Sequence, residues 1–166
     1  MGFVRRSYDL APSHRTLSAA IECGKHLIAH AHQTRHGVGW INQNQVQPLA
    51  GFAHGSAGIA WALLKLAAMT GQDRFCKTAH AAIAHERTLF SPEAGNWRDL
   101  RTSIKGATHS KRNGDYFMST WCHGAVGIGL ARLSTVQQLV DNEIGLEIET
   151  ALNTTLHCGF GGNHSL

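Results

Sequence analysis

The sequence predicts an all-α protein that forms part of an α/α toroid, a barrel in which inner apolar helices are shielded by outer amphipathic helices. Three observations support this fold class. Apolar and more polar helical segments alternate along the chain, a glycine-rich pattern occurs twice, and no segment shows a convincing strand pattern. Repeated pairs of one apolar and one polar helix are the units from which such folds are built.

The repeated pattern reads Gly-Phe-Ala-His-Gly-x-x-Gly-Ile from residue 51 and Trp-Cys-His-Gly-x-x-Gly-Ile from residue 121. His54 and His123 are 69 positions apart (123 − 54 = 69), and the two glycines and the isoleucine that follow them share this offset. Glycine allows close backbone approach where inner helices converge. We therefore expect both histidines to face a common centre.

Hydrophobic periodicity predicts five helices. They are expected over 15–32, 56–70, 73–90 and 136–155, with the fourth in chain order inside 121–133, where a glycine-rich stretch again precedes an apolar helix. The first is amphipathic. The second is apolar around most of its circumference and ends at Gly71, so it is an inner helix. The third has Asp73 as its expected N-cap and carries Glu86 and Arg87, as an outer helix would. The fourth repeats the apolar pattern, and the fifth has acidic residues on one side.

Three segments lack periodicity and are expected to be irregular. They are a polar leader over 1–14, a loop over 37–48 and a long loop over 91–120. Long ordered loops are often functional. In the last of them, Asn96, Trp97, Asp99 and Arg101 are expected to stabilise the loop through hydrogen bonds and an ion pair rather than to act on a substrate.

Composition excludes several classes of protein. The 166 residues are 43% hydrophobic and 16% charged, which fits a folded globular chain. The net charge of +4 comes from scattered basic residues without a binding motif, so we expect no nucleic-acid partner. No apolar run approaches the roughly 20 residues of a membrane span. Four cysteines without a C-x-x-C pair or a signal peptide predict reduced thiols and a cytoplasmic location.

Cys122 and His123 place a thiol beside an imidazole before an apolar helix. A thiolate is a good metal ligand, and an imidazole can exchange protons near neutral pH. Cys122 is therefore a candidate metal ligand, and His54 and His123 are candidate catalytic residues. The structural alternative is that the cysteine packs in the core and that each histidine binds a backbone carbonyl.

Both glycine-rich blocks, with Glu-x-x-Asn-Trp-x-Asp-Leu-Arg (residues 93–101) between them, resemble the lanthionine synthetase C-like family. The likeness is to the C-terminal cyclase domain of the class II (LanM) enzymes, and it spans residues 15 to 166. It implies an α/α toroid with a central zinc ion. It also implies a reaction in which cysteine thiols of a lanthipeptide precursor add to dehydroalanine or dehydrobutyrine, forming thioether (lanthionine) rings.

The resemblance also assigns roles to residues. It implies that Cys122 is a zinc ligand, that His54 moves protons at the reacting centre, and that His123 occupies the polar position beside the ligand. In the family, a Cys-His-Gly block supplies the remaining protein ligands. The stretch 159–166 resembles the sequence just before that block, so the remaining ligands are expected beyond Leu166.

The same register implies that residues 1–166 are a fragment of one cyclase domain. Its expected partners are the precursor peptide, the dehydratase region and the missing toroid repeats, and the isolated fragment is expected to be inactive. His157 and Cys158, followed by glycine, show the Cys-His pair in reverse order and are not expected to replace it.

Two other functions stay open. One is a metal-free binding or scaffold module that keeps the toroid. The other is a different α/α-barrel enzyme that acts on glycans, but such enzymes need paired carboxylates, and the inner segments offer none.

Overall fold

A computed structural model describes residues 13–43, 45–101, 110–112, 115–139 and 141–159. Its helices are α2 (His14–Ala29), α3 (Ser56–Thr70), α4 (Asp73–Arg87), α5 (Ala125–Leu133), the 3-10 turn η1 (Val136–Gln138) and α6 (Glu143–Cys158). Its strands are β1 (His32–Thr34), β2 (Gly37–Gly39), β3 (Phe90–Ser91), β4 (Asn96–Trp97), β5 (Ser110–Arg112) and β6 (Asp115–Phe117). The chain is mostly helical, which confirms the all-α class. All but the last two residues of the predicted leader lie outside the described residues.

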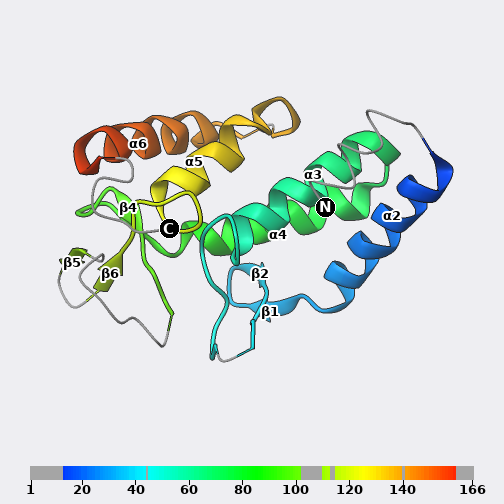
Figure 1. Cartoon of the computed structure of the whole chain (residues 1–166), viewed down its shortest axis with the longest axis horizontal. Coiled ribbons are helices and arrows are strands. Elements are labelled where there is room, and N and C mark those ends of the chain that lie inside the picture. The colour runs from blue at the N-terminus through cyan, green and yellow to red at the C-terminus, as the bar shows by residue number, and fades with distance from the viewer. Residues whose placement is uncertain (1–12, 44, 102–109, 113–114, 140, 160–166) are drawn as a thin grey trace.

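Helices α3 and α4 form an antiparallel hairpin (Figure 1). The bounds of α3 agree with the prediction, and Gly71 ends it in the left-handed conformation with φ of 66°. Seven residues of α3 are buried, as expected for an inner helix. The predicted cap of α4 was wrong by one position, because Gln72 is the N-cap and Asp73 is the first helical residue. There the carboxylate still lies favourably at the positive end of the helix dipole.

Helices α5 and α6 form a second hairpin, and α5 also packs against α3. The prediction of one continuous helix over 136–155 was wrong. Leu139 leaves η1 in an extended conformation, and α6 begins at Glu143. The carboxylate of Asp141 accepts a hydrogen bond of 2.9 Å from the N–H of Glu143, which satisfies a free donor of the new helix.

The expectation that the chain has no strands was also wrong. The described residues include three antiparallel pairs of strands, β1–β2, β3–β4 and β5–β6, between the helices. The predicted first helix ends at Ala29, and β1–β2 follows it and packs on α4. The β5–β6 pair lies within the predicted long loop. The β3–β4 pair begins at Phe90, the last residue of the predicted third helix, which instead ends at Arg87. Strands of two or three residues are too short to produce a readable alternation.

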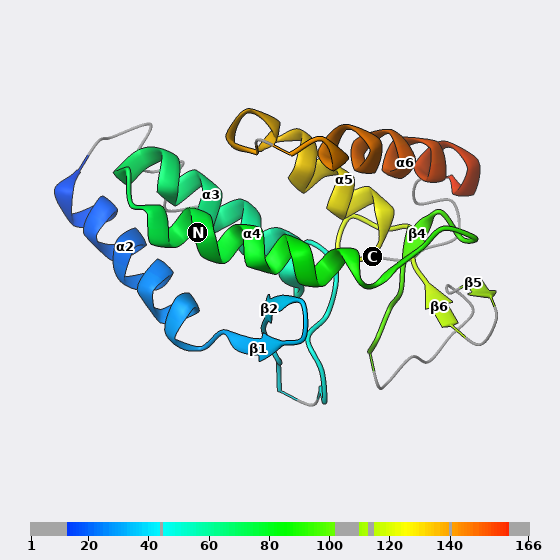
Figure 2. The same ribbon diagram turned by 180° about the vertical axis from the view of Figure 1, so that it is seen from behind.

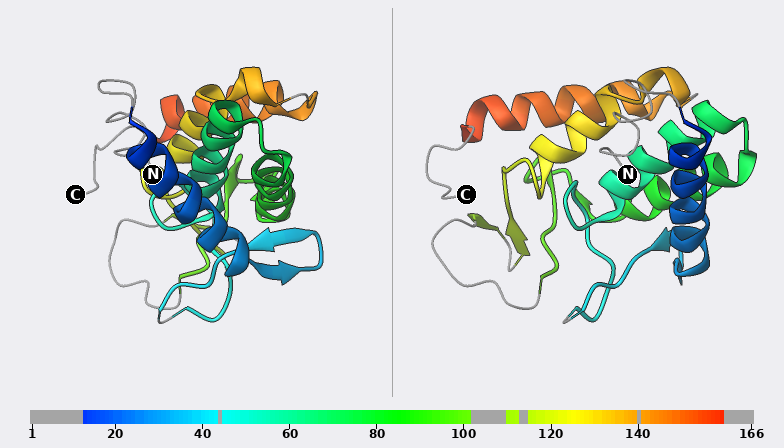
Figure 3. Two further views of the ribbon diagram at one scale, coloured as in Figure 1. Left: turned by 90° about the vertical axis from the view of Figure 1, so that its right-hand side faces the viewer. Right: turned by 45° about the vertical axis from the view of Figure 1, so that its right-hand side comes forward.

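Two apolar clusters form the core. One lies between α2, α3 and α4 and reaches Ile144 of α6, and the other surrounds α5 and Trp97. Helix α2 lies at one end of the molecule and β5–β6 at the other (Figures 1 and 2). Figure 3 shows α6 running along the outside of α5. The described residues form two adjoining helix hairpins. The partial toroid to which they would belong stays a prediction.

The outer helix α4 carries a charge that does not face solvent. Glu86, predicted as a polar outer residue, is 0% exposed, and its carboxylate binds the guanidinium of Arg132 in α5 at 2.8 Å. Arg132 also binds Glu147 of α6 at 2.7 Å, and Glu147 binds Arg87. This buried network joins the two helix hairpins.

Candidate functional site

The loops before α3 and α5 are joined by backbone hydrogen bonds. The N–H groups of Phe52 and Ala53 donate to the carbonyl of Cys122 at 3.0 and 3.2 Å. As a result, the rings of His54 and His123 lie together, with centroids 6.1 Å apart and planes tilted by 32°. The two histidines therefore meet at one centre, as the repeated pattern predicts.

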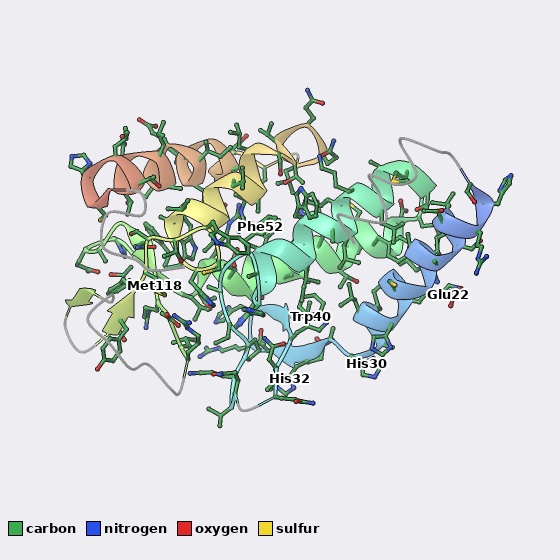
Figure 4. All side chains as sticks on the ribbon, viewed as in Figure 1. Glu22, His30, His32, Trp40, Phe52 and Met118 are labelled. Atoms are coloured by element: carbon green, nitrogen blue, oxygen red, sulfur yellow. The ribbon has the colours of Figure 1, made fainter. Side chains whose placement is uncertain are left out.

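Both glycine-rich patterns build the same turn. A Cβ atom on Gly58 would collide with the carbonyl oxygen of Phe52, and one on Gly127 would collide with that of Trp121. Phe52, which is labelled in Figure 4, and Trp121 are themselves equivalent in the repeat. Both turns thus depend on a close backbone approach that only glycine allows. The two segments therefore share a backbone geometry as well as a sequence pattern.

The N-cap residues of α3 and α5 make no side-chain cap hydrogen bond. Buried side chains from outside the two glycine-rich patterns accept hydrogen bonds from the first turns of these helices instead. For α3, Oε1 of Glu86 accepts hydrogen bonds from the N–H groups of Gly51 and Ala57, both at 3.0 Å. For α5, Oδ1 of Asn96 accepts from the N–H of Ala125 at 2.8 Å. These bonds satisfy helix donors that lack partners within the helix and so fix both loops.

The thiol of Cys122 is half-buried and forms no disulfide. Its Sγ lies 3.1 Å from Oγ1 of Thr120, and either atom can donate. The same threonine oxygen accepts a hydrogen bond of 3.3 Å from the N–H of His123. Thr120 therefore fixes the sulfur relative to the backbone of the loop.

The two histidines differ in environment. His123 is 4% exposed, and its pKa is lowered to about 4, first by burial and then by the positive charge of Arg101, against an opposing effect of Asp99. Its ring is therefore neutral at neutral pH. His54 is exposed, and its backbone carbonyl accepts a hydrogen bond of 2.8 Å from Asn42.

Asp99 and Arg101 form an ion pair beside the two loops. Nε of Arg101 donates to both carboxylate oxygens, at 2.9 and 3.1 Å. Burial acts to raise the pKa of the Asp99 carboxyl, but the hydrogen bonds and charge of Arg101 lower it below its usual range. The predicted ion pair is confirmed. It also acts electrostatically on His123 and Cys122, which the sequence did not indicate.

Zinc requires about four ligands, and this part of the structure supplies one suitable thiol. Within the described ranges, no group of three or more His, Cys, Asp or Glu side chains is arranged to hold a metal ion. Cys122 fits a single ligand position, because it forms no disulfide and is partly exposed. His157 and Cys158 are exposed at the end of α6, and Nδ1 of His157 bonds to its own helix. The predicted ligand-preceding stretch, apart from Gly159, lies outside the described residues.

A family model described as "Lanthionine synthetase C-like protein" matches residues 4–166. The chain belongs to the lanthionine synthetase C-like family. The three sequence blocks that predicted this membership include the two loops that meet at the histidine pair and the anchor that caps α5.

The chain is also similar in sequence to a curated protein. The lacticin 481/lactococcin biosynthesis protein LcnDR2 of Lactococcus lactis subsp. lactis is 28% identical over 90 residues, which is 54% of this chain. The match covers 8% of that relative, so the chain spans a small part of its length. As for membranes, none of the helices in the described ranges is both long and apolar enough to span a bilayer; the predicted cytoplasmic location stays a prediction.

Sequence reasoning missed Glu86, Arg132 and Thr120. Glu86 continues the buried stripe of α4, and a charged residue at such a position is a readable signal of a buried ion pair. The stripe consists of Phe75, Ala79, Ala82 and Ile83. Arg132 likewise lies among the buried positions of α5. Thr120 carries no comparable signal, because its role depends on the turn that places it against Cys122.

Proposed function

We propose that this chain is part of a lanthipeptide cyclase, in which cysteine thiols add to dehydroalanine or dehydrobutyrine to form thioether rings. The observation that carries the proposal is the juxtaposition of an accessible thiol, Cys122, with the histidine pair of His54 and His123, on two loops of the family fold. The name of the relative, a lacticin 481 biosynthesis protein, is consistent with this class of product.

The exposure of each side chain at the site suggests its role in the reaction. Cys122 would be one protein ligand of zinc, which, when bound, lowers the pKa of a substrate thiol and so supplies a nucleophile at neutral pH. Thr120 holds the ligand sulfur by a hydrogen bond. His123 is buried and hydrogen-bonds to the backbone of Ala50, next to the other loop. His54 is exposed beside it and can reach a substrate.

The bond changes in the reaction balance without a further reagent. The substrate thiol gives its proton to the imidazole of His54, its sulfur attacks the β-carbon of the dehydro residue, and the C=C electrons move to give an enolate. His54, carrying a proton, then donates it to the α-carbon, so that S–H has been added across the double bond. Imidazole suits this step because its ordinary pKa lies near neutral pH. Arg101, which is paired with Asp99, acts electrostatically on Cys122 and His123 beside this centre.

The proposal is tested with the complete synthetase that contains this chain and a dehydrated precursor peptide. Ring formation is followed by mass spectrometry as the loss of alkylatable substrate thiols, and zinc content is measured separately. We expect His54→Asn to slow ring formation by about 10²-fold or more and to leave zinc content unchanged. Cys122→Ala should reduce both.

The matched control is His157→Asn, which removes an exposed histidine outside the two loops and should change neither quantity. Ring formation at the wild-type rate in His54→Asn would refute the proton role. A wild-type protein that binds no zinc and forms no rings would support the metal-free binding module instead.

A further inference from the structure

His26 and His30 form a pair on the last turn of α2, outside the site described above. Their ring centroids are 4.0 Å apart and their planes are tilted by 31°. Both side chains are exposed, and Figure 4 shows His30 where α2 leads towards β1. The residues are four positions apart, so they share one face of the helix.

The hydrogen bond from the His30 ring to the backbone of His26 sets which ring nitrogen of His30 carries the hydrogen. Nδ1 of His30 lies 2.8 Å from the carbonyl oxygen of His26, which also accepts the backbone N–H of His30 at 3.1 Å. A carbonyl oxygen can only accept, so Nδ1 carries the hydrogen. In the neutral ring, Nε2 is then left with a free lone pair, which is the state required of a metal ligand.

We propose that His26 and His30 bind a borderline divalent transition-metal ion such as Zn²⁺. Two histidines at positions i and i+4 on one helix face are a known arrangement for zinc. A Zn–N distance of about 2.0–2.1 Å places two tetrahedral ligand nitrogens about 3.3 Å apart, and the centres of their rings about 5 Å apart. The two centroids are 4.0 Å apart, and because both side chains are exposed, rotation about their side-chain bonds can bring them to that spacing. Water completes the coordination.

The site is a two-residue site. Cys23 is exposed one turn earlier on the same face, but the described residues contain no group of three potential ligands arranged around one ion. Binding through two imidazoles is weaker than in a four-ligand structural site. The ion is therefore exchangeable, and its site is independent of the thiol on the α5 loop.

Metal binding would stabilise α2, the helix with few buried residues. Only Ala20 and Gly24 are buried in the 16 residues of α2, compared with seven buried residues in α3. An ion that bridges one turn holds that turn in helical conformation and favours the folded state by mass action. The bridge therefore acts at the junction of α2 and β1–β2.

A matched pair of variants tests the site by calorimetric titration of the reduced, metal-free chain with ZnCl₂. His157 in α6 is also exposed, and its Nδ1 bonds to the carbonyl of Asn153 at 2.7 Å, but the residue four positions earlier is not a histidine. We expect His30→Gln to remove one zinc equivalent or weaken it at least tenfold, and His157→Gln to leave the isotherm unchanged.

The converse variant, Asn153→His, recreates the pair on α6 and should add one zinc equivalent. Zinc bound through Cys122 contributes equally to all these isotherms, so failure of the proposed cyclase function does not affect the comparison. Identical titrations for His30→Gln and the wild type, or no added equivalent in Asn153→His, would overturn the proposal.

Discussion

The hairpins α3–α4 and α5–α6 are two copies of one design, related by the offset of 69 residues along both helices. Buried positions correspond, as in Phe75 with Ile144 and Ala82 with Ala151. The two copies differ at the thiol of the candidate site, because the position of Cys122 in the second turn is occupied by Ala53 in the first. Glycine and apolar positions therefore specify the scaffold, and single departures from the repeat specify the thiol site.

The two copies also differ in what covers them. Helix α5 packs on α3, but the corresponding face of α5 borders an open apolar groove of about 390 Å³ between α5 and α6. Leu64 is 1% exposed, whereas Leu133, its equivalent, is 59% exposed. The groove is lined by Trp121, Ala125, Val126, Gly129, Leu130, Leu133, Ile148, Ala151, Leu152 and Thr155.

The buried charge pair breaks the repeat in a third way. Glu86 and Arg132 pair across the two copies, whereas their equivalents are Thr155 and Leu63. The pair is thus a property of the joint between the hairpins and not of the hairpin itself. Burial raises the pKa of the Glu86 carboxyl, against the opposing charge of Arg132.

Removing Glu86 tests this joint and should have the largest effect on stability. Glu86→Ala leaves Arg132 buried without this partner and leaves the N–H groups of Gly51 and Ala57 without their acceptor. We expect a loss of about 3–5 kcal/mol in the free energy of unfolding, measured by urea denaturation. Glu86→Gln retains an acceptor and should lose less. Equal stability of Glu86→Ala and wild type would show that the carboxylate is not buried in the joint.

The leucine pair tests the covering of the two copies. Leu64→Ala creates a cavity in the first core and should cost about 2–5 kcal/mol. Leu133→Ala at the equivalent position removes an exposed side chain and should stay within about 0.5 kcal/mol. The same denaturation assay measures both. A large loss in Leu133→Ala would mean that another part of the chain fills the groove.

A smaller effect follows from His85, whose equivalent in the second copy is Thr154. Burial lowers the pKa of His85, and the charges of His36 and His32 lower it further. The unfolded chain, with a histidine pKa of about 6.5, therefore binds the proton first. Stability should fall as pH drops below about 6.5, towards the folded pKa. His85→Thr should flatten the fall in urea midpoint over this range, and an unchanged slope would contradict the assignment.

The parts of the fold that could be predicted are those with long periodic patterns. The bounds of α3 follow from an apolar run ended by Gly71, and the meeting of His54 with His123 follows from the repeat. The ion pair of Asp99 with Arg101 was also expected, because the loop needs an anchor.

The rest depends on contacts between distant segments. The burial of Glu86 requires Arg132, which lies 46 residues later, so local polarity indicated an outer position instead. The end of the first helix at Ala29 depends on the pairing of β1 with β2. The roles of Cys122, His54 and His123 in catalysis are proposals, because the described residues contain no group of potential ligands arranged around one metal ion.

The separation of Glu86 from Arg132 has a consequence for synthesis on the ribosome. The first hairpin can form from local contacts, but its buried carboxylate gains its partner only after a further 46 residues have been added. At about 5–20 residues per second, this takes roughly 2–9 s. During that interval Glu86 has only the N–H groups of Gly51 and Ala57 as partners, so its set of partners is complete only once Arg132 has been added.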